Sequence, residues 1–139
     1  MKLEKQVCSL ELAKKLKELG VKQESIFYWT RSYTRKTGVF QADSKYYLAY
    51  SKNKKYYAEY ECSAFTVAEL GELLPPGYHS VKVCGGLEWQ CLYIDFKGEN
   101  FDQMIDAKSC GKITEADARA KMLIYLLENK LTPASQDKE

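Results

Sequence analysis

The sequence lacks the residue patterns on which most metal-binding sites depend. Its 139 residues include one histidine, and its five cysteines are irregularly spaced with no CxxC pair: Cys8, Cys62, Cys84, Cys91 and Cys110. Structural zinc sites usually pair ligands about two to four residues apart, whereas His79, Cys84 and Cys91 are separated by five and seven positions. We therefore expect no metal, no cofactor and no disulfide framework, and we interpret the cysteines as free thiols.

Arrangements for nucleophilic catalysis or phosphate binding are missing as well. Any Ser-His or Cys-His pair would have to use His79, and Cys84 lies five residues away, on the opposite face of a strand. Gly85-Gly86 stands between two expected strands and does not open a helix, so it is a hairpin turn and not a phosphate loop. No catalytic residue is predicted.

One weak enzymatic reading remains, that of a metal-dependent nuclease. Such enzymes hold a metal ion with clustered carboxylates and often use a lysine to position the attacking water. The sequence partly matches that pattern at Asp95 and Lys97, with Glu88, Asp102 and Asp106 nearby. Acids at the polar positions of a solvated strand give the same pattern, so this reading ranks third among the functions considered.

Long apolar runs are also absent. No stretch approaches the roughly 20 residues of a membrane-spanning helix, and the segment 1–6 is charged and leads into no signal peptide. This predicts no contact with a membrane and a cytoplasmic location. A 45% hydrophobic chain of this length fits one domain, so we expect residues 1–131 to form a single α+β domain followed by a disordered polar tail, 132–139.

Charge is distributed unevenly although the net charge is only +2. Residues 31–60 carry +5, whereas residues 61–107 carry −6. Such asymmetry is typical of surfaces that bind partners through electrostatic attraction.

Local signals predict two helices in the first half of the chain. The first should cover 10–19, with Ser9 as N-cap, leucines recurring on one face, and Gly20 at its end. The second should begin after Thr66, where Glu69 completes a capping box, and end before the prolines at 75 and 76.

A third helix is predicted after Thr114, with acidic residues in its first turn and its end at 129 or 130. A broad apolar flank at Met122, Tyr125 and Leu126 extends its core stripe. Either the sheet and a neighbouring helix cover this flank, or it is a dimer contact, so the chain is a monomer or a homodimer.

The intervening segments predict strands joined by short turns. The segment 31–44 reads as a long loop or an extended hairpin arm. The expected fold class is α+β, with a mainly antiparallel sheet packed with three helices in the order α-β-ββ-α-βββ-α. The strands are expected at 26–30, at 45–50 and 55–60 as a hairpin, and at 79–83, 87–96 and 101–107 as a meander.

The hairpin 45–60 is the most distinctive surface candidate, because tyrosines interleave with lysines along it. Tyrosine is enriched at protein interfaces, whereas rings among basic side chains also stack on bases and neutralise phosphates. A purely structural role, with half of the rings in the core, is the third alternative. The candidate binding residues are Arg35, Lys36, Tyr46, Tyr50, Lys52, Lys54, Lys55 and Tyr57.

Three blocks of sequence resemble a family of short uncharacterised open reading frames of bacteriophages and prophages. They are EKQVCSLELAKKLKELGVKQES followed by FYW, then AFTVAELGELLP, then TEADARAKMLIYLLEN. The family has no assigned activity, so the resemblance implies context only: a cytoplasmic accessory protein in a bacterial host. The resulting hypothesis is a non-enzymatic module that binds a host or phage protein, with nucleic-acid binding through the basic hairpin as the alternative.

Overall fold

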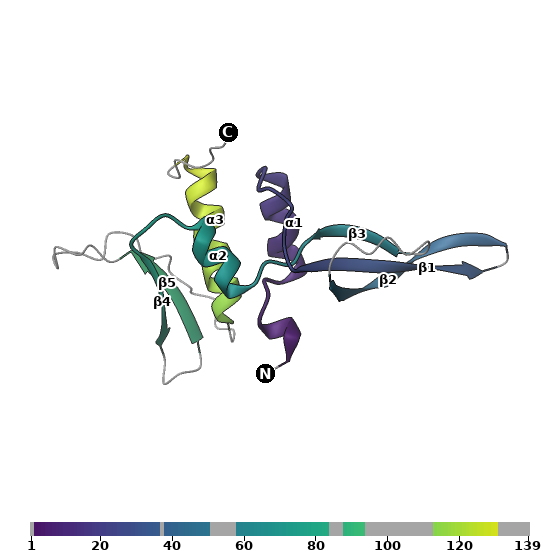
Figure 1. Ribbon diagram of the computed structural model, residues 1–139, viewed down its shortest axis with the longest axis horizontal. Helices are drawn as coiled ribbons and strands as arrows, with labels where there is room; N and C mark the ends of the chain where they lie inside the picture. The colour runs from purple at the N-terminus through teal and green to yellow at the C-terminus, as the bar shows by residue number, and fades with distance from the viewer. Residues whose placement is uncertain (1, 37, 51–57, 84–87, 94–112, 131–139) are drawn as a thin grey trace.

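The computed structural model describes residues 2–36, 38–50, 58–83, 88–93 and 113–130 (Figure 1). Within these ranges the chain has the α+β fold predicted from the sequence, with α-helices and antiparallel sheets in the expected order. A short 3-10 helix, Leu3–Lys5, comes first. The other elements are α1 (Leu10–Glu18), β1 (Phe27–Lys36), β2 (Val39–Tyr50), β3 (Ala58–Ser63), α2 (Val67–Leu73), β4 (Tyr78–Val83), β5 (Glu88–Tyr93) and α3 (Glu115–Glu128).

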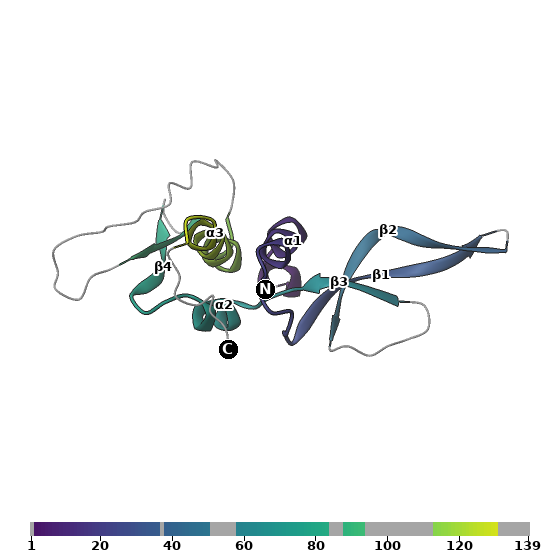
Figure 2. The same ribbon diagram turned by 90° about the horizontal axis from the view of Figure 1, so that it is seen from above.

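The three helices stand between two sheets (Figures 1 and 2). One sheet has the strand order β2-β1-β3 and the other is the pair β4-β5. Helix α1 packs on β3, whereas α3 packs on β5 and contacts both α1 and α2. The β1–β2 ribbon, residues 27–36 and 39–50, extends away from the helices in both views, and we call it the arm.

The pairing of the strands corrects one sequence prediction. Residues 45–50 and 55–60 were expected to pair with each other, but β1 lies between β2 and β3 and pairs antiparallel with both. The reason is that 31–44 forms the outer part of the arm, so that β1 and β2 make the hairpin, with Gly38 at a φ of +82° in its turn. Tyr46, Tyr47 and Tyr50 of the first repeat thus lie in β2, whereas Tyr60 of the second repeat lies in β3 on the other side of β1.

Two irregularities interrupt the ladders of the three-stranded sheet. Arg31 pairs with Tyr46 but Tyr33 pairs with Ala42, so one residue of β1 faces three residues of β2. On the other side of β1, Trp29 pairs with Cys62 and Thr30 with Tyr60, which leaves one extra residue in β3. Such bulges bend a strand and locally end its regular pairing.

Helix α1 ends as the sequence predicts. Gly20 has a φ of +89°, its N–H donates to the Lys17 carbonyl at 3.1 Å, and the Val21 N–H donates to the Leu16 carbonyl at 3.1 Å. These two bonds form a Schellman motif, which requires the left-handed conformation that glycine adopts without strain. At the start of α1, Ser9 is the N-cap residue, but its side chain makes no capping bond.

Helix α2 begins with the predicted capping box. Thr66 Oγ1 accepts from the Glu69 N–H at 3.2 Å, and Glu69 Oε1 accepts from the Thr66 N–H at 2.9 Å. The same carboxylate also accepts from Ser25 Oγ at 2.8 Å and from the Ile26 N–H at 3.2 Å. Glu69 therefore fixes both the start of α2 and the chain that leads into β1.

Helix α3 supplies more buried residues to the core than any other described element, and their burial shows how its apolar flank is covered. Met122 and Leu126 are fully buried within the single chain, whereas Tyr125 is 40% exposed. Two of the three residues proposed as a dimer surface are therefore core residues, because α1, α2 and β5 cover the helix from several sides. Of the two alternatives for this flank, cover within the chain thus applies to Met122 and Leu126.

Several expectations fall outside the described residues: the Gly85-Gly86 turn, the strand 101–107 and the tail 132–139. The single-domain prediction for 1–131 stays a prediction. Within the described ranges, none of the helices has the length and apolar character needed to cross a membrane.

Candidate functional site

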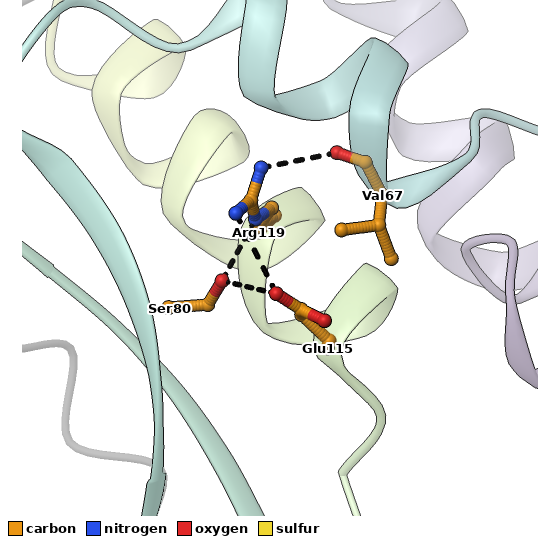
Figure 3. A network of polar contacts seen from close by, with 4 residues as sticks. All are labelled: Val67, Ser80, Glu115 and Arg119. Carbon is orange, nitrogen blue, oxygen red and sulfur yellow. Dashed lines mark hydrogen bonds and ion pairs between the residues drawn. The ribbon is translucent and has the colours of Figure 1, made fainter.

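A connected polar cluster lies where α2, α3 and β4 meet (Figure 3). Arg119 donates from Nε to Ser80 Oγ at 2.9 Å and from Nη1 to the Val67 carbonyl at 3.1 Å. Ser80 Oγ in turn donates to Glu115 Oε1 at 2.6 Å, and the same oxygen lies 3.5 Å from Arg119 Nη2. The four residues form one closed network.

This network joins elements of the fold and engages the Ser80 hydroxyl, the Arg119 guanidinium and one carboxylate oxygen of Glu115. The Ser80 hydroxyl both donates and accepts, and the Arg119 guanidinium is shared among three oxygens. Gly71 on α2 makes room for it, since a Cβ at that position would collide with Arg119 Nη1. We interpret the cluster as a structural contact that holds α2 and α3 against β4.

The three thiols that the structure describes are unreactive at neutral pH. Cys8, Cys62 and Cys91 are free and buried, as the sequence predicted for cysteines without a partner. Burial raises the pKa of the Cys8 thiol to about 12 and the pKa values of Cys62 and Cys91 to about 11. All three remain protonated at neutral pH, and a protonated thiol is neither a nucleophile nor a good metal ligand.

Carboxylates do not assemble into a metal centre within the described parts of the chain, where no group of three or more His, Cys, Asp or Glu side chains is placed to hold an ion. Glu88 begins β5, whereas Asp95, Asp102 and Asp106 lie outside the described residues. Asp117 is a structural carboxylate, because its Oδ1 accepts from the Ser9 N–H at 2.7 Å and thereby links α3 to the start of α1.

A pocket of about 310 Å³ lies beside α2. Two of its three acids are already engaged: Glu69 in the capping box and Glu24 in an ion pair with Lys22 at 3.2 Å. Among these acids, only Glu72 makes neither contact. The pocket therefore has few polar groups oriented to bind a ligand. It is lined by Lys22, Glu24, Phe65, Glu69, Glu72 and Leu73.

The arm holds the sequence-predicted binding residues that the structure describes. Tyr50 is 71% exposed and its ring meets Phe27 edge-on at 5.7 Å between centroids. Tyr46 is half-buried, with Lys14 Nζ 5.0 Å and the Arg31 guanidinium carbon 5.7 Å from its ring centroid. The Tyr46 ring is thus engaged by two cations of its own chain and is a poorer stacking surface than Tyr50.

The other predicted residues are distributed along the same arm or lie beyond the described chain. Arg35 and Lys36 stand at the outer end of β1, in register with Phe40 and Val39. The remaining candidates, Lys52, Lys54, Lys55 and Tyr57, lie outside the described residues.

Strand β2 is the edge strand of its sheet, and the direction of its main-chain groups follows from one hydrogen bond. The Phe27 carbonyl accepts from the Ala64 N–H at 2.8 Å and so points to the β3 side. Because main-chain groups alternate sides along a strand, those of Tyr28 and Thr30 point to β2, where their partners are Ala49 and Tyr47.

It follows that the N–H and C=O groups of Tyr46, Leu48 and Tyr50 point away from β1. No other strand of the described chain pairs with this edge. An unpaired edge is a template for another strand, and the segment 46–50 carries no charge that would oppose one. We call residues 46–50 the open edge.

Exposed apolar side chains accompany the open edge. Tyr47 is 44% exposed and lies in register with Thr30 on the face opposite Tyr46. Ile26, just before β1, is 49% exposed, and Val39 at the outer end of the arm is 59% exposed. Sequence reasoning missed Tyr47, Ile26 and Val39 as surface residues, although the alternation of a half-buried strand is the signal that separates Tyr47 from Tyr46.

Comparison with family models, with curated proteins and with solved structures found no match to this chain.

Proposed function

We propose that this chain is a non-enzymatic phage or prophage accessory protein that binds a host or phage protein in the bacterial cytoplasm through the open edge of its arm. One observation carries the proposal: the outward main-chain groups of Tyr46, Leu48 and Tyr50 stand on an uncharged segment of the edge strand, residues 46–50, beside exposed aromatic rings. Strand addition at such an edge gains affinity from main-chain hydrogen bonds and specificity from alternate side chains.

Further support comes from the chemistry of the described residues. The buried thiols are protonated and the Arg119 network is closed, so neither supplies a reactive group. Exposed tyrosine is well suited to a protein contact, because the ring buries apolar area while the hydroxyl keeps a polar partner.

The test compares two substitutions at Leu48 in capture from a bacterial lysate. Leu48→Pro removes the outward N–H, and because that N–H does not bond β1 the sheet should keep its ladder. Leu48→Ala shortens the same side chain but keeps the N–H, so it is the matched control. Proteins captured by the wild type and by Leu48→Ala, but lost with Leu48→Pro, identify partners that bind by strand addition.

Two results would count against the proposal. One is a wild-type protein that recovers nothing above background. The other is a set of partners retained equally by both variants, since a partner of that kind does not need the edge N–H.

A second candidate function, nucleic-acid binding, is favoured by the basic side chains along the arm. Lys14 and Arg31 lie against the Tyr46 ring, Lys45 beside it is exposed, and Arg35 and Lys36 end β1. A two-stranded ribbon of this kind fits the major groove of DNA, and its cations would release counterions from the phosphates.

This alternative makes a separate prediction about salt. Binding to a short fluorescent DNA duplex or single strand should weaken steeply as salt rises, and charge reversal of Lys45, Lys52, Lys54 and Lys55 to Glu should reduce the slope. Insensitivity of any observed binding both to salt and to these substitutions would exclude the basic segment 45–55 as a nucleic-acid site.

A further inference from the structure

The open edge is complementary to itself. Read from either end, the residues whose main-chain groups point outward are Tyr46, Leu48 and Tyr50, a tyrosine-leucine-tyrosine series that is unchanged by reversal. An antiparallel partner strand always runs in the reverse direction. A second copy of the same edge therefore presents the same series in the order that antiparallel pairing requires.

A two-fold axis at Leu48 sets the register of such a pair. Leu48 then stands opposite Leu48 of the second copy, and Tyr46 stands opposite Tyr50 in both directions. Each of these positions carries outward N–H and C=O groups, so each pair exchanges two bonds, giving about six main-chain hydrogen bonds in total. If the register of the two β2 strands shifted by one residue, the outward N–H and C=O groups of one copy would face residues of the other copy whose main-chain groups already bond β1.

The side chains agree with this register. Tyr47, on the other face, stands opposite Ala49 of the second copy, which places a large side chain beside a small one on both sides of the axis. The paired segment 46–50 carries no charge, so no like charges meet within it. On the face that carries Tyr46, the rings of Phe27, Tyr50 and the second copy's Tyr46 would form one row. This row would extend the Phe27–Tyr50 contact that the chain already makes.

The bulge in β2 limits this ladder to the open edge. The three residues 43–45 face a single residue of β1, which bends the strand at the outer end of the regular segment. Pairing in the antiparallel sense also directs the outer end of each arm, with its exposed Val39, toward the helices of the other copy. The arm extends away from its own helices (Figure 2), so that end is available for such a contact.

From this complementarity we infer that two copies of the chain associate through β2, residues 46–50, to form a continuous six-stranded antiparallel sheet in the order β3-β1-β2-β2-β1-β3. This inference rests on the proposed function in using the same edge, and it names the chain itself as one occupant. A foreign strand would then compete with the second copy, so that dilution of the protein favours capture of other partners.

Sedimentation equilibrium of the full chain tests the association directly. The wild type should show a reversible monomer–dimer equilibrium. Leu48→Pro removes two central bonds, one for each protomer, and should weaken the dimer about tenfold more than the matched Leu48→Ala does. A wild type that remains monomeric at the highest concentration at which it stays in solution would overturn the inference.

Cysteine cross-linking tests the register and does not depend on the fold tolerating proline. Opposed residues in a hydrogen-bonded pair lie about 5.5 Å apart at Cα, which is within disulfide range. Leu48→Cys should therefore form a covalent dimer under a mild oxidant, whereas Ala49→Cys, which faces Tyr47, should not. Equal cross-linking of the two variants, or none with Leu48→Cys, would contradict the two-fold axis at Leu48.

The dimer and the proposed function can fail separately. A strictly monomeric protein whose lysate partners are lost with Leu48→Pro would overturn the dimer and retain strand addition by other proteins. A dimer that captures nothing on dilution would retain the self-association and overturn the binding of a host or phage partner.

Discussion

The guanidinium of Arg119 on α3 occupies the space that a side chain on Gly71 of α2 would fill. Two helices thus approach each other closely only because one position has no Cβ. The hydrogen bonds of Arg119 to Val67 and Ser80 hold the guanidinium in that space, so it cannot move aside without losing them.

Gly71→Ala should therefore destabilise the wild-type protein. Displacing Arg119 costs about 1.5–3 kcal/mol in hydrogen bonds to a charged group, against a gain of about 1 kcal/mol in helix propensity. In an Arg119→Ala background the collision is gone, and Gly71→Ala should stabilise instead. Urea denaturation of the four proteins measures this change of sign, and a destabilisation of equal size in both backgrounds would show that Arg119 is not the obstacle.

The Glu69 carboxylate should matter more than an ordinary helix cap. Glu69→Ala removes acceptors for Thr66, Ser25 and Ile26 and should lower the free energy of unfolding by about 2 kcal/mol, against about 1 kcal/mol for Thr66→Ala. Because the two residues share one capping box, thermal or urea unfolding of the double variant should show a loss smaller than the sum. Strict additivity would mean that the box does not act as a unit.

Asp117 should make the protein less stable as pH rises through the mildly acidic range. Burial raises the pKa of its carboxyl in the folded state above the value of about 3.9 in the unfolded chain. Its contribution to the free energy of unfolding is therefore greatest below that pH and is lost as pH rises through the folded-state pKa.

Asp117→Asn keeps an oxygen that can accept from Ser9 N–H but cannot ionise. Relative to the wild type it should gain stability as pH rises from 3.5 to 7, as followed by urea denaturation. The matched Asp117→Ala variant lacks both the acceptor and the ionisable group, so it should be about 1 kcal/mol less stable than Asp117→Asn at every pH. A stability difference between wild type and Asp117→Asn that does not vary with pH would refute the role assigned to burial.

The three described thiols should react slowly in the folded protein. With pKa values of about 12 for Cys8 and about 11 for Cys62 and Cys91, almost none of each is thiolate at pH 8. Mass spectrometry of peptides after brief iodoacetamide treatment should find these positions unmodified, and fully modified once urea is present. Rapid labelling of Cys91 without denaturant would indicate that β5 opens readily.

Features encoded by neighbouring residues were predictable, and features that depend on distant contacts were not. The Thr66 capping box and the end of α1 at Gly20 are confirmed because each depends on residues only a few positions apart. The pairing of 45–50 with 55–60 was wrong because the sequence does not reveal that β1 lies between them. Long-range pairing is decided by the whole sheet, and local pattern carries little information about it.

The candidate site likewise combines features that local sequence predicts with features that depend on distant contacts. Tyr50 is exposed, whereas Tyr46 is contacted by Lys14, from a helix that is distant in sequence. The role of either residue in binding stays a prediction. The burial of Met122 and Leu126 depends likewise on which elements surround α3. The open edge itself follows from strand order, so no local motif could have located it.

The bulge between Arg31 and Tyr33 inserts two residues into β2, and an even insertion preserves the alternation of side chains on both sides of it. The arm beyond the bulge therefore presents the same two faces as the segment before it. Because β1 has no extra residue at this point, the pairs beyond the bulge keep the faces that β1 sets, and deletion of one residue within 43–45 would leave a single-residue bulge like that in β3. The bulge is thus a position where β2 can change its length without changing which side chains face each other in the outer arm.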